Sequence, residues 1–81
     1  MTFARARIDT AAWPVPPIFR LIQQRGDVPP GEMYRVFNMG IGLVFAVAPD
    51  DVSAVLNEVE GAIPIGEVVP WTGQPVQLLG L

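Results

Sequence analysis

The chain lacks the side chains that carry most enzyme chemistry. Its 81 residues include no cysteine and no histidine, and all five basic residues are arginines. Without cysteine there is neither a disulfide framework nor a thiolate metal site. Without histidine and lysine the chain has no usual general base, lacks the commonest metal ligand and offers no amine for a Schiff base. The chain is therefore poorly equipped to be an enzyme alone.

Charged residues are also scarce. They make up 16% of the chain, whereas 51% is hydrophobic, and soluble domains average about 25% charged residues. We expect a second copy, or a missing part of the same protein, to cover some apolar surface. A small domain that is merely rich in apolar residues is the alternative. The net charge of −3 argues against a nucleic-acid partner.

No segment is typical of export or of membrane insertion. Residues 1–9 contain arginines but no apolar core, so they do not form a signal peptide. The longest apolar run, residues 39–48, is about half of the roughly 20 residues that a membrane helix needs. We expect a soluble, cytoplasmic protein that has no membrane partner.

Three short amphipathic helices are predicted. The first begins at Pro17, which suits a first helical turn, and ends at Gly26. The second begins near Pro30, and the third follows Asp50 as its N-cap and closes at Gly61. Their apolar positions recur at helical spacing. These positions are Ile18, Phe19, Leu21 and Ile22, then Met33, Val36 and Phe37, and then Val52, Val55, Leu56 and Val59.

Three strands complete the predicted fold. Residues 43–48 are apolar on both faces, which predicts a strand covered on both sides. Residues 63–69 predict a second strand, with Pro64 favouring an edge or a strand start. If these two strands are parallel neighbours, residues 41–69 form a right-handed crossover. Residues 72–74 predict a hairpin turn into a strand at residues 75–79.

The predicted class is therefore α+β, in the order helix-helix-strand-helix-strand-strand. Residues 1–12 show no sustained period and are interpreted as an extended lead-in, and residues 13–81 as the folded portion of one small domain.

The candidate site is the segment that joins the second helix to the first predicted strand. Gly40 and Gly42 do not form a dinucleotide fingerprint, because Phe45 stands where a third glycine is needed. They indicate either a tight junction with positive φ, which is favoured, or a close approach of the backbone to an anion. Arg35 and Asn38 lie three residues apart and can share one side of a short helix. Arg35 offers a forked donor; the alternative is a surface salt bridge for Arg35 and a helix cap for Asn38.

Several of these segments together resemble a known family. They are Trp13-x-x-Pro16-x-Ile18-Phe19, Gly26-x-Val28, Glu32-Met33-Tyr34-Arg35-x-Phe37-Asn38-Met39-Gly40-Ile41-Gly42 and Ile65-Gly66-Glu67. The chain from about Arg7 to Val69 is similar to the C-terminal end of the aminoimidazole ribonucleotide synthetases, also called phosphoribosylformylglycinamidine cyclo-ligases. Val36 departs from the family's common threonine, which removes one possible hydrogen bond.

The resemblance implies an enzyme much longer than this chain. Members use ATP and Mg²⁺ to close the imidazole ring of purines, and the complete enzyme is expected to be a homodimer. Their N-terminal domain supplies most ATP and magnesium contacts, and their C-terminal domain is an α/β sandwich beside the cleft. Arg35, Asn38, Gly40 and Gly42 correspond to substrate-binding positions that line the cleft, whereas the resemblance assigns no catalytic or metal-binding residue to this chain.

The leading hypothesis is a C-terminal fragment of such a ligase, acting in purine biosynthesis only with the remainder of the enzyme. The alternative is a stand-alone, non-catalytic module that binds a partner or self-associates. A third possibility, suggested by Val36, is a diverged relative that acts on another phosphorylated substrate.

Overall fold

The computed structural model describes residues 3–71 and 73–81 and has the predicted α+β class. The elements in chain order are β1 (Phe3–Asp9), α1 (Pro17–Gly26), α2 (Pro30–Val36), the 3-10 helix η1 (Pro49–Asp51), α3 (Val52–Glu58), β2 (Gly66–Trp71) and β3 (Val76–Leu79). The described residues form two compact units. One contains the residues up to Trp13 and those from Phe45 to Gly80, and the other contains residues 14–44 with Leu81.

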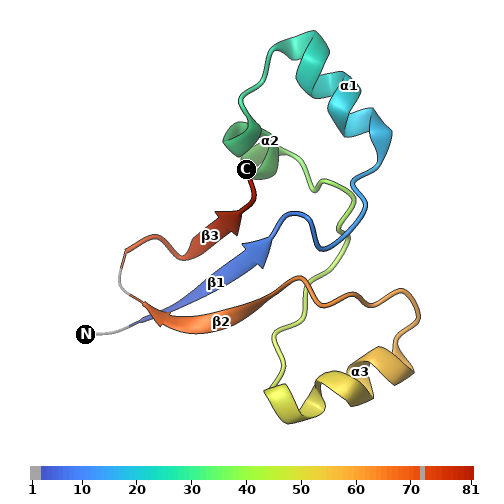
Figure 1. Ribbon diagram of the computed structural model, residues 1–81, viewed down its shortest axis with the longest axis vertical. Coiled ribbons are helices and arrows are strands. Elements are labelled where there is room, and N and C mark those ends of the chain that lie inside the picture. Colours follow the sequence, from blue (N-terminus) through green and yellow to red (C-terminus); the bar gives the residue numbers. More distant parts are fainter. Residues whose placement is uncertain (1–2, 72) are drawn as a thin grey trace. The chain divides into compact units, whose positions relative to one another are not determined.

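A three-stranded sheet organises the first unit, and β1 is its central strand (Figure 1). β2 pairs with β1 in antiparallel fashion, with Val69 opposite Arg5. β3 pairs with the other edge of β1 in parallel, with Val76 opposite Ala6. Because β1 has a paired strand on each side, β2 and β3 each form their strand–strand hydrogen bonds with β1.

The sheet has one apolar face, and its other face, called the polar face here, carries all the charged residues of the strands beside Phe3, Val69, Trp71 and Leu79. Successive side chains of a strand point to opposite sides, and paired residues share a side. The polar face includes the Arg7–Glu67 ion pair, at 3.0 Å. On the apolar face, the side chains of Val68 and Val76 are 58% and 52% exposed to solvent. The apolar face consists of Ala4, Ala6, Ile8, Val68, Pro70, Val76 and Leu78.

The start of the chain is part of the folded unit and not only a lead-in. Its backbone is extended, as expected, but residues 3–9 form the central strand, which the sequence analysis did not find. The strand does carry a period of two, since alanine or isoleucine alternates with arginine or aspartate from Ala4 to Asp9. Alanine is a weak apolar signal and is depleted in strands, so this alternation predicts a strand only weakly.

The predicted strand at residues 43–48 does not form. The structure has irregular backbone there, and no described strand lies beside it to complete a hydrogen-bonded ladder. The predicted right-handed crossover across residues 41–69 is therefore wrong as well. β2 begins at Gly66, after Pro64, and it is an edge strand, as the proline indicated.

The predicted hairpin between the last two strands is also wrong. β2 and β3 flank β1 and do not pair with each other. The predicted turn includes Thr72, which lies outside the described residues. Arg5 holds this connection instead, because its Nε donates to the carbonyl of Gln74 at 2.9 Å and its guanidinium lies 4.2 Å from the Trp71 ring centroid.

The second unit is built from α1 and α2. Pro17 opens α1 as predicted, but Asp27, with φ of 50°, adopts the left-handed conformation expected of Gly26. Met33 is fully buried, and the rings of Phe19 and Phe37 lie 6.2 Å apart at a tilt of 60°. These contacts give the small unit its core.

The three predicted apolar helix faces are covered only in part. Side chains predicted to be buried have the helical spacing expected of them but remain 38–58% exposed, because the described part of the chain provides no layer to cover them. They are Ile18, Leu21, Val36, Leu56 and Val59. α3 is shorter than predicted and is entered through η1, without a side-chain cap from Asp50 or Asp51.

Gly66 allows β1 and β2 to approach, and this can be tested. A Cβ at this position would collide with the carbonyl oxygen of Arg7 on the facing strand. We expect Gly66→Ala to lower the free energy of unfolding by about 1–3 kcal/mol or more, measured by urea denaturation. Gly31→Ala is the matched control, because nothing lies within 4 Å of its Cβ position. Equal stability of both variants would contradict the close approach.

Candidate functional site

The candidate residues lie in the last turn of α2 and in the segment that follows it. Arg35 lies in the last turn of the helix, but Phe37 already has an extended backbone, with φ of −109° and ψ of 155°. Phe37 is the C-cap, and its N–H donates to the carbonyl of Met33 at 2.9 Å. Asn38 is therefore outside the helix. The predicted sharing of one helix side by Arg35 and Asn38 is wrong, because the three-residue spacing holds only within a helix.

Arg35 forms the surface salt bridge that the sequence analysis considered. Its Nε donates to Glu32 Oε2 at 2.9 Å, and its Nη2 donates to Oε1 of the same carboxylate. This pairing lowers the pKa of Glu32 and raises that of Arg35, in both cases chiefly through the hydrogen bond between them. Both groups are well exposed to solvent. Nη1 of Arg35 has no partner among the described residues, so the guanidinium can still donate to a ligand.

Asn38 organises the turn that follows. Its Oδ1 accepts the N–H of Gly40 at 2.9 Å, and its carbonyl accepts the N–H of Ile41 at 2.9 Å. Side-chain bonds of this kind are characteristic of asparagine in turns. The amides of Gly40 and Ile41 are consequently already satisfied within the chain. The N–H of Gly42 and the side-chain amide nitrogen of Asn38 have no partner among the described residues.

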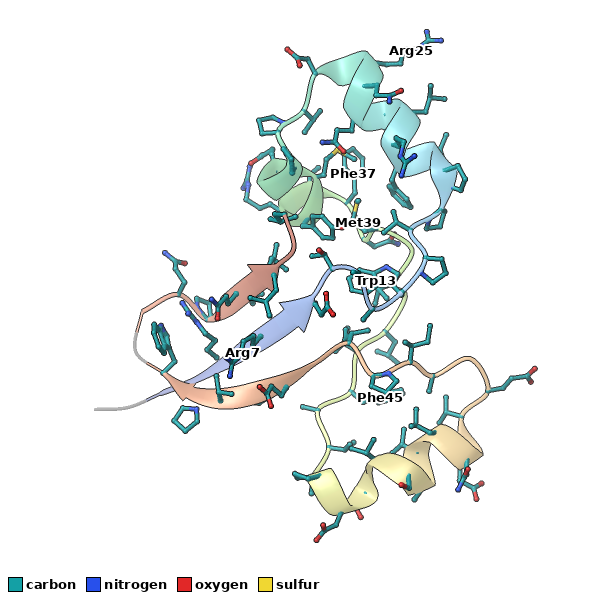
Figure 2. The ribbon with its side chains drawn as sticks, viewed as in Figure 1. Arg7, Trp13, Arg25, Phe37, Met39 and Phe45 are labelled. Atoms are coloured by element: carbon teal, nitrogen blue, oxygen red, sulfur yellow. The ribbon has the colours of Figure 1, made fainter. Side chains whose placement is uncertain are left out.

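Two apolar side chains anchor this turn on either side of Asn38. Phe37 contacts Phe19, and Met39 is only 6% exposed although its φ is positive, at 54°. Figure 2 shows both side chains beside α2. Asn38 lies between them in sequence and is exposed. The turn therefore presents the Asn38 side chain on the surface while its neighbours are held in place.

The two glycines of the motif have different explanations. Gly40 has φ of 92°, and a Cβ there would lie 2.5 Å from Cδ of Pro16. Its lack of a side chain is thus required by the tight junction that the sequence analysis favoured. Gly42 has no positive φ and nothing within 4 Å of its Cβ position. The described structure does not account for a glycine there.

The segment offers a ligand three hydrogen-bond donors that have no partner among the described residues. They are Nη1 of Arg35, the amide nitrogen of Asn38 and the backbone N–H of Gly42. Such a set suits a ligand rich in acceptors, such as a phosphate or an amide carbonyl. No group of three or more histidine, cysteine, aspartate or glutamate side chains that could hold a metal occurs among residues 3–71 and 73–81.

Two further residues position the candidate site, and the sequence alone did not assign them to it. The carboxylate of Glu32 binds the guanidinium of Arg35. The two residues lie three apart on a helix, and this spacing can indicate such a pair. Pro16 approaches Gly40 from a different part of the chain. No local pattern predicts that contact.

Comparison with known proteins identifies the family. Residues 1–77 match the family described as AIR synthase related protein, C-terminal domain. The chain belongs to this family. The match extends at both ends beyond the region of resemblance noted from the motifs, and it confirms that resemblance.

The similar curated proteins are phosphoribosylformylglycinamidine cyclo-ligases. The one from Enterococcus faecalis is 49% identical over 65 residues, which cover 80% of this chain and 19% of the relative. The one from Bacillus pumilus is 55% identical over 75 residues, covering 82% and 22%. The chloroplastic one from Arabidopsis thaliana is 45% identical over 76 residues, covering 89% and 20%. This chain spans about a fifth of the length of these relatives. None of the helices in its described part is long and apolar enough to cross a bilayer.

The salt bridge can be tested through the titration of Glu32. In Arg35→Gln we expect the pKa of Glu32 to rise, because the hydrogen bond that lowers it is lost. Carbon-detected NMR of the Glu32 carboxyl group across a pH series measures this. The pair stabilises the fold above the pKa of an unpaired glutamate, and its contribution disappears as the pH falls through the lowered pKa. An unchanged Glu32 titration in Arg35→Gln would show that the two side chains are not paired in solution.

The different roles of the glycines lead to opposite expectations for alanine. Gly40→Ala should lower the free energy of unfolding by about 1–3 kcal/mol, because alanine strains the positive φ and meets Pro16. Gly42→Ala should leave the stability of the isolated chain unchanged. Urea denaturation followed by circular dichroism compares the two directly. A larger loss of stability for Gly42→Ala would overturn the assignment.

Proposed function

We propose that this chain is the C-terminal part of an ATP-dependent phosphoribosylformylglycinamidine cyclo-ligase in purine biosynthesis, and that it is not catalytic without the rest of the enzyme. The observation that carries the proposal is identity of 49–55% to cyclo-ligases over about four-fifths of the chain. The same matches span only about a fifth of each relative. The absence of histidine, lysine and cysteine agrees with chemistry performed elsewhere in the enzyme.

The reaction implied by the family has two steps. ATP phosphorylates the formyl amide oxygen of formylglycinamidine ribonucleotide, and an internal nitrogen then attacks that carbon as phosphate leaves. Both the substrate and the intermediate are rich in anionic oxygens. The donors of this chain, Arg35, Asn38 and the Gly42 amide, would bind such oxygens and orient the substrate. Gly40 would contribute by holding the turn and not by direct contact.

Arg35 would act as a positioned donor and not as a free cation. Glu32 holds its Nε and Nη2 and thereby fixes the plane of the guanidinium. Nη1 is left to bind a phosphate or carbonyl oxygen. A charge-assisted hydrogen bond of this kind contributes about 1.5–3 kcal/mol. Val36, next in the chain, is 58% exposed within these 81 residues.

The magnesium ions and most of the ATP contacts belong, in this proposal, to the remainder of the enzyme. The described residues offer no cluster of acidic ligands for a metal, so we assign no catalytic step to Mg²⁺ at this segment. We further propose that the complete enzyme is a homodimer and cytoplasmic. The stand-alone module considered as an alternative is not favoured, because the named relatives are cyclo-ligases.

A chimera tests the proposal. The matched 65-residue segment of the Enterococcus faecalis relative is replaced by the corresponding residues of this chain. We expect the chimera to convert formylglycinamidine ribonucleotide and ATP to the aminoimidazole product, while the isolated 81-residue chain has no activity. A folded chimera without activity would contradict the proposal, and so would turnover by the isolated chain.

Arg35 has a matched control in the same chimera. Arg35→Ala should lower kcat/KM by roughly 10–150-fold, which corresponds to the loss of one charge-assisted hydrogen bond. Arg25→Ala removes the same charge from the last turn of α1, where no role is assigned, and should leave kcat/KM unchanged. Equal losses in the two variants would indicate a general effect of charge and would refute a specific role for Arg35.

A further inference from the structure

Arg5 and Arg7 lie on the polar face of the sheet, as alternate residues of β1. Their side chains therefore leave the same face of the strand about 7 Å apart. Glu67 on β2 and Gln77 on β3 are the cross-strand partners of Arg7, and Figure 2 shows Arg7 beside β1 and β2. All three strands belong to one compact unit. The arrangement of these side chains is therefore internal to that unit.

The hydrogen bonding of Arg7 is incomplete. Its Nη2 lies 3.0 Å from a single oxygen of Glu67. Its Nε is buried and has no hydrogen-bond partner among the residues that the structure describes. Nε and Nη2 form the edge of a guanidinium that can hold both oxygens of an oxyanion at once. Glu67 therefore occupies half of this edge, and the other half lacks the acceptor that a buried N–H requires.

Arg35 shows the complete form of this contact in the same chain. Its Nε and Nη2 donate to the two oxygens of Glu32, whereas the contact between Arg7 and Glu67 involves Nη2 alone. The side chains of Arg7 and Glu67 are 39% and 65% exposed, and an exposed ion pair of this kind contributes little to stability. An anion from solution can therefore replace Glu67 on the Arg7 edge at a small cost.

Arg5 is held in place and still has donors to offer. Its Nε donates to the carbonyl of Gln74 at 2.9 Å, and its guanidinium lies 4.2 Å from the centroid of the Trp71 ring. The two terminal nitrogens of Arg5, like the side-chain amide of Gln77, have no hydrogen-bond partner in the described part of the chain. A guanidinium that is already fixed by two contacts loses little further freedom when it binds an anion.

We propose that Arg5, Arg7 and Gln77 form a binding site for one phosphate group, called the arginine site, and that Glu67 occupies the Arg7 edge when the phosphate is absent. The ligand is a phosphate dianion, either free or carried as a monoester by a small molecule. Its tetrahedral oxygens can accept from side chains on two strands, whereas the two oxygens of a carboxylate lie in one plane. This inference goes beyond the proposed function and does not depend on the ligase activity.

Two acidic residues on the same face limit the affinity of the arginine site. Glu67 competes with the ligand for Arg7. Asp9 follows two residues after Arg7, and its Oδ1 accepts the N–H of Ala11 at 2.9 Å. Two arginines in a chain of net charge −3 are too few to neutralise a row of phosphates, which argues against a nucleic acid as the ligand. A single phosphate group is the anion that matches these donors.

NMR of the arginine side chains tests the proposal on the 81-residue chain. The Nε–H signals are followed while sodium phosphate or ribose 5-phosphate is added at constant pH and ionic strength. We expect the signals of Arg5 and Arg7 to shift until they saturate, and those of Arg20 and Arg25 on α1 to stay in place. Tighter binding of ribose 5-phosphate identifies a phosphate ester as the source of the group, and equal or tighter binding of inorganic phosphate identifies the free anion.

Three results of this titration overturn the proposal. The first is the absence of a saturable shift with either phosphate compound. The second is an equal shift of all four arginines, which would reflect a general effect of the added anion. The third is a shift of Arg7 with a polyglutamate peptide and with neither phosphate compound, because the face would then bind an acidic protein segment.

Substitutions separate a binding role of Arg7 from a merely structural one. Arg7→Lys retains the charge but loses the planar fork, and it should raise the Kd for phosphate roughly tenfold or more. Arg20→Lys is the matched control and should leave the Kd unchanged. Glu67→Gln should lower the Kd about two- to fivefold, because the competing ion pair is lost. Circular dichroism verifies that each variant is folded. Unchanged or weaker binding by folded Glu67→Gln overturns the proposal, because a purely structural ion pair predicts no gain in affinity.

Discussion

The backbone of β1 is the interaction on which the sheet depends. Both other strands bond to it, β2 in antiparallel and β3 in parallel fashion, and they do not bond to each other. Side chains add to this pairing from the polar face, through the Arg7–Glu67 ion pair and the contact of Arg5 with Trp71. Loss of β1 would thus leave two unpaired segments and not a smaller sheet. Gly66 matters for the same reason, since it permits the two backbones to meet.

The local sequence pattern predicted the helices, which depend mainly on neighbouring residues. The helical spacing of apolar residues and the proline at the start of α1 located the helices to within a few residues. The strands depended on distant partners, and here the sequence was less informative. A run of six apolar residues indicates strand-forming tendency, but whether a strand forms depends on a neighbour with free backbone groups. The alternation in β1 was present but weak, because alanine supplies most of its apolar side.

The candidate site shows the same division. The Arg35–Glu32 pair and the turn-forming role of Asn38 follow from residue type and spacing. The difference between Gly40 and Gly42 could not be obtained from sequence, where the two form one motif. Only the structure shows that Pro16 lies against the first and that no described residue lies within 4 Å of the Cβ position of the second. The exposed helix faces likewise have the expected spacing, and what they lack is a covering layer.

The long separation between β1 and its partners has a consequence for biosynthesis. The bond from Arg5 to the carbonyl of Gln74 joins residues 69 positions apart, and so does the bond from Thr10 to Leu79. During translation β1 is made before every other element of this chain, and β3 is made last. Residues 14–44 of the α1–α2 unit are contiguous in sequence and can make their contacts with one another while synthesis continues. The central strand, in contrast, cannot be paired on both edges until β3 has left the ribosome, and an unpaired strand edge is prone to aggregation for that period.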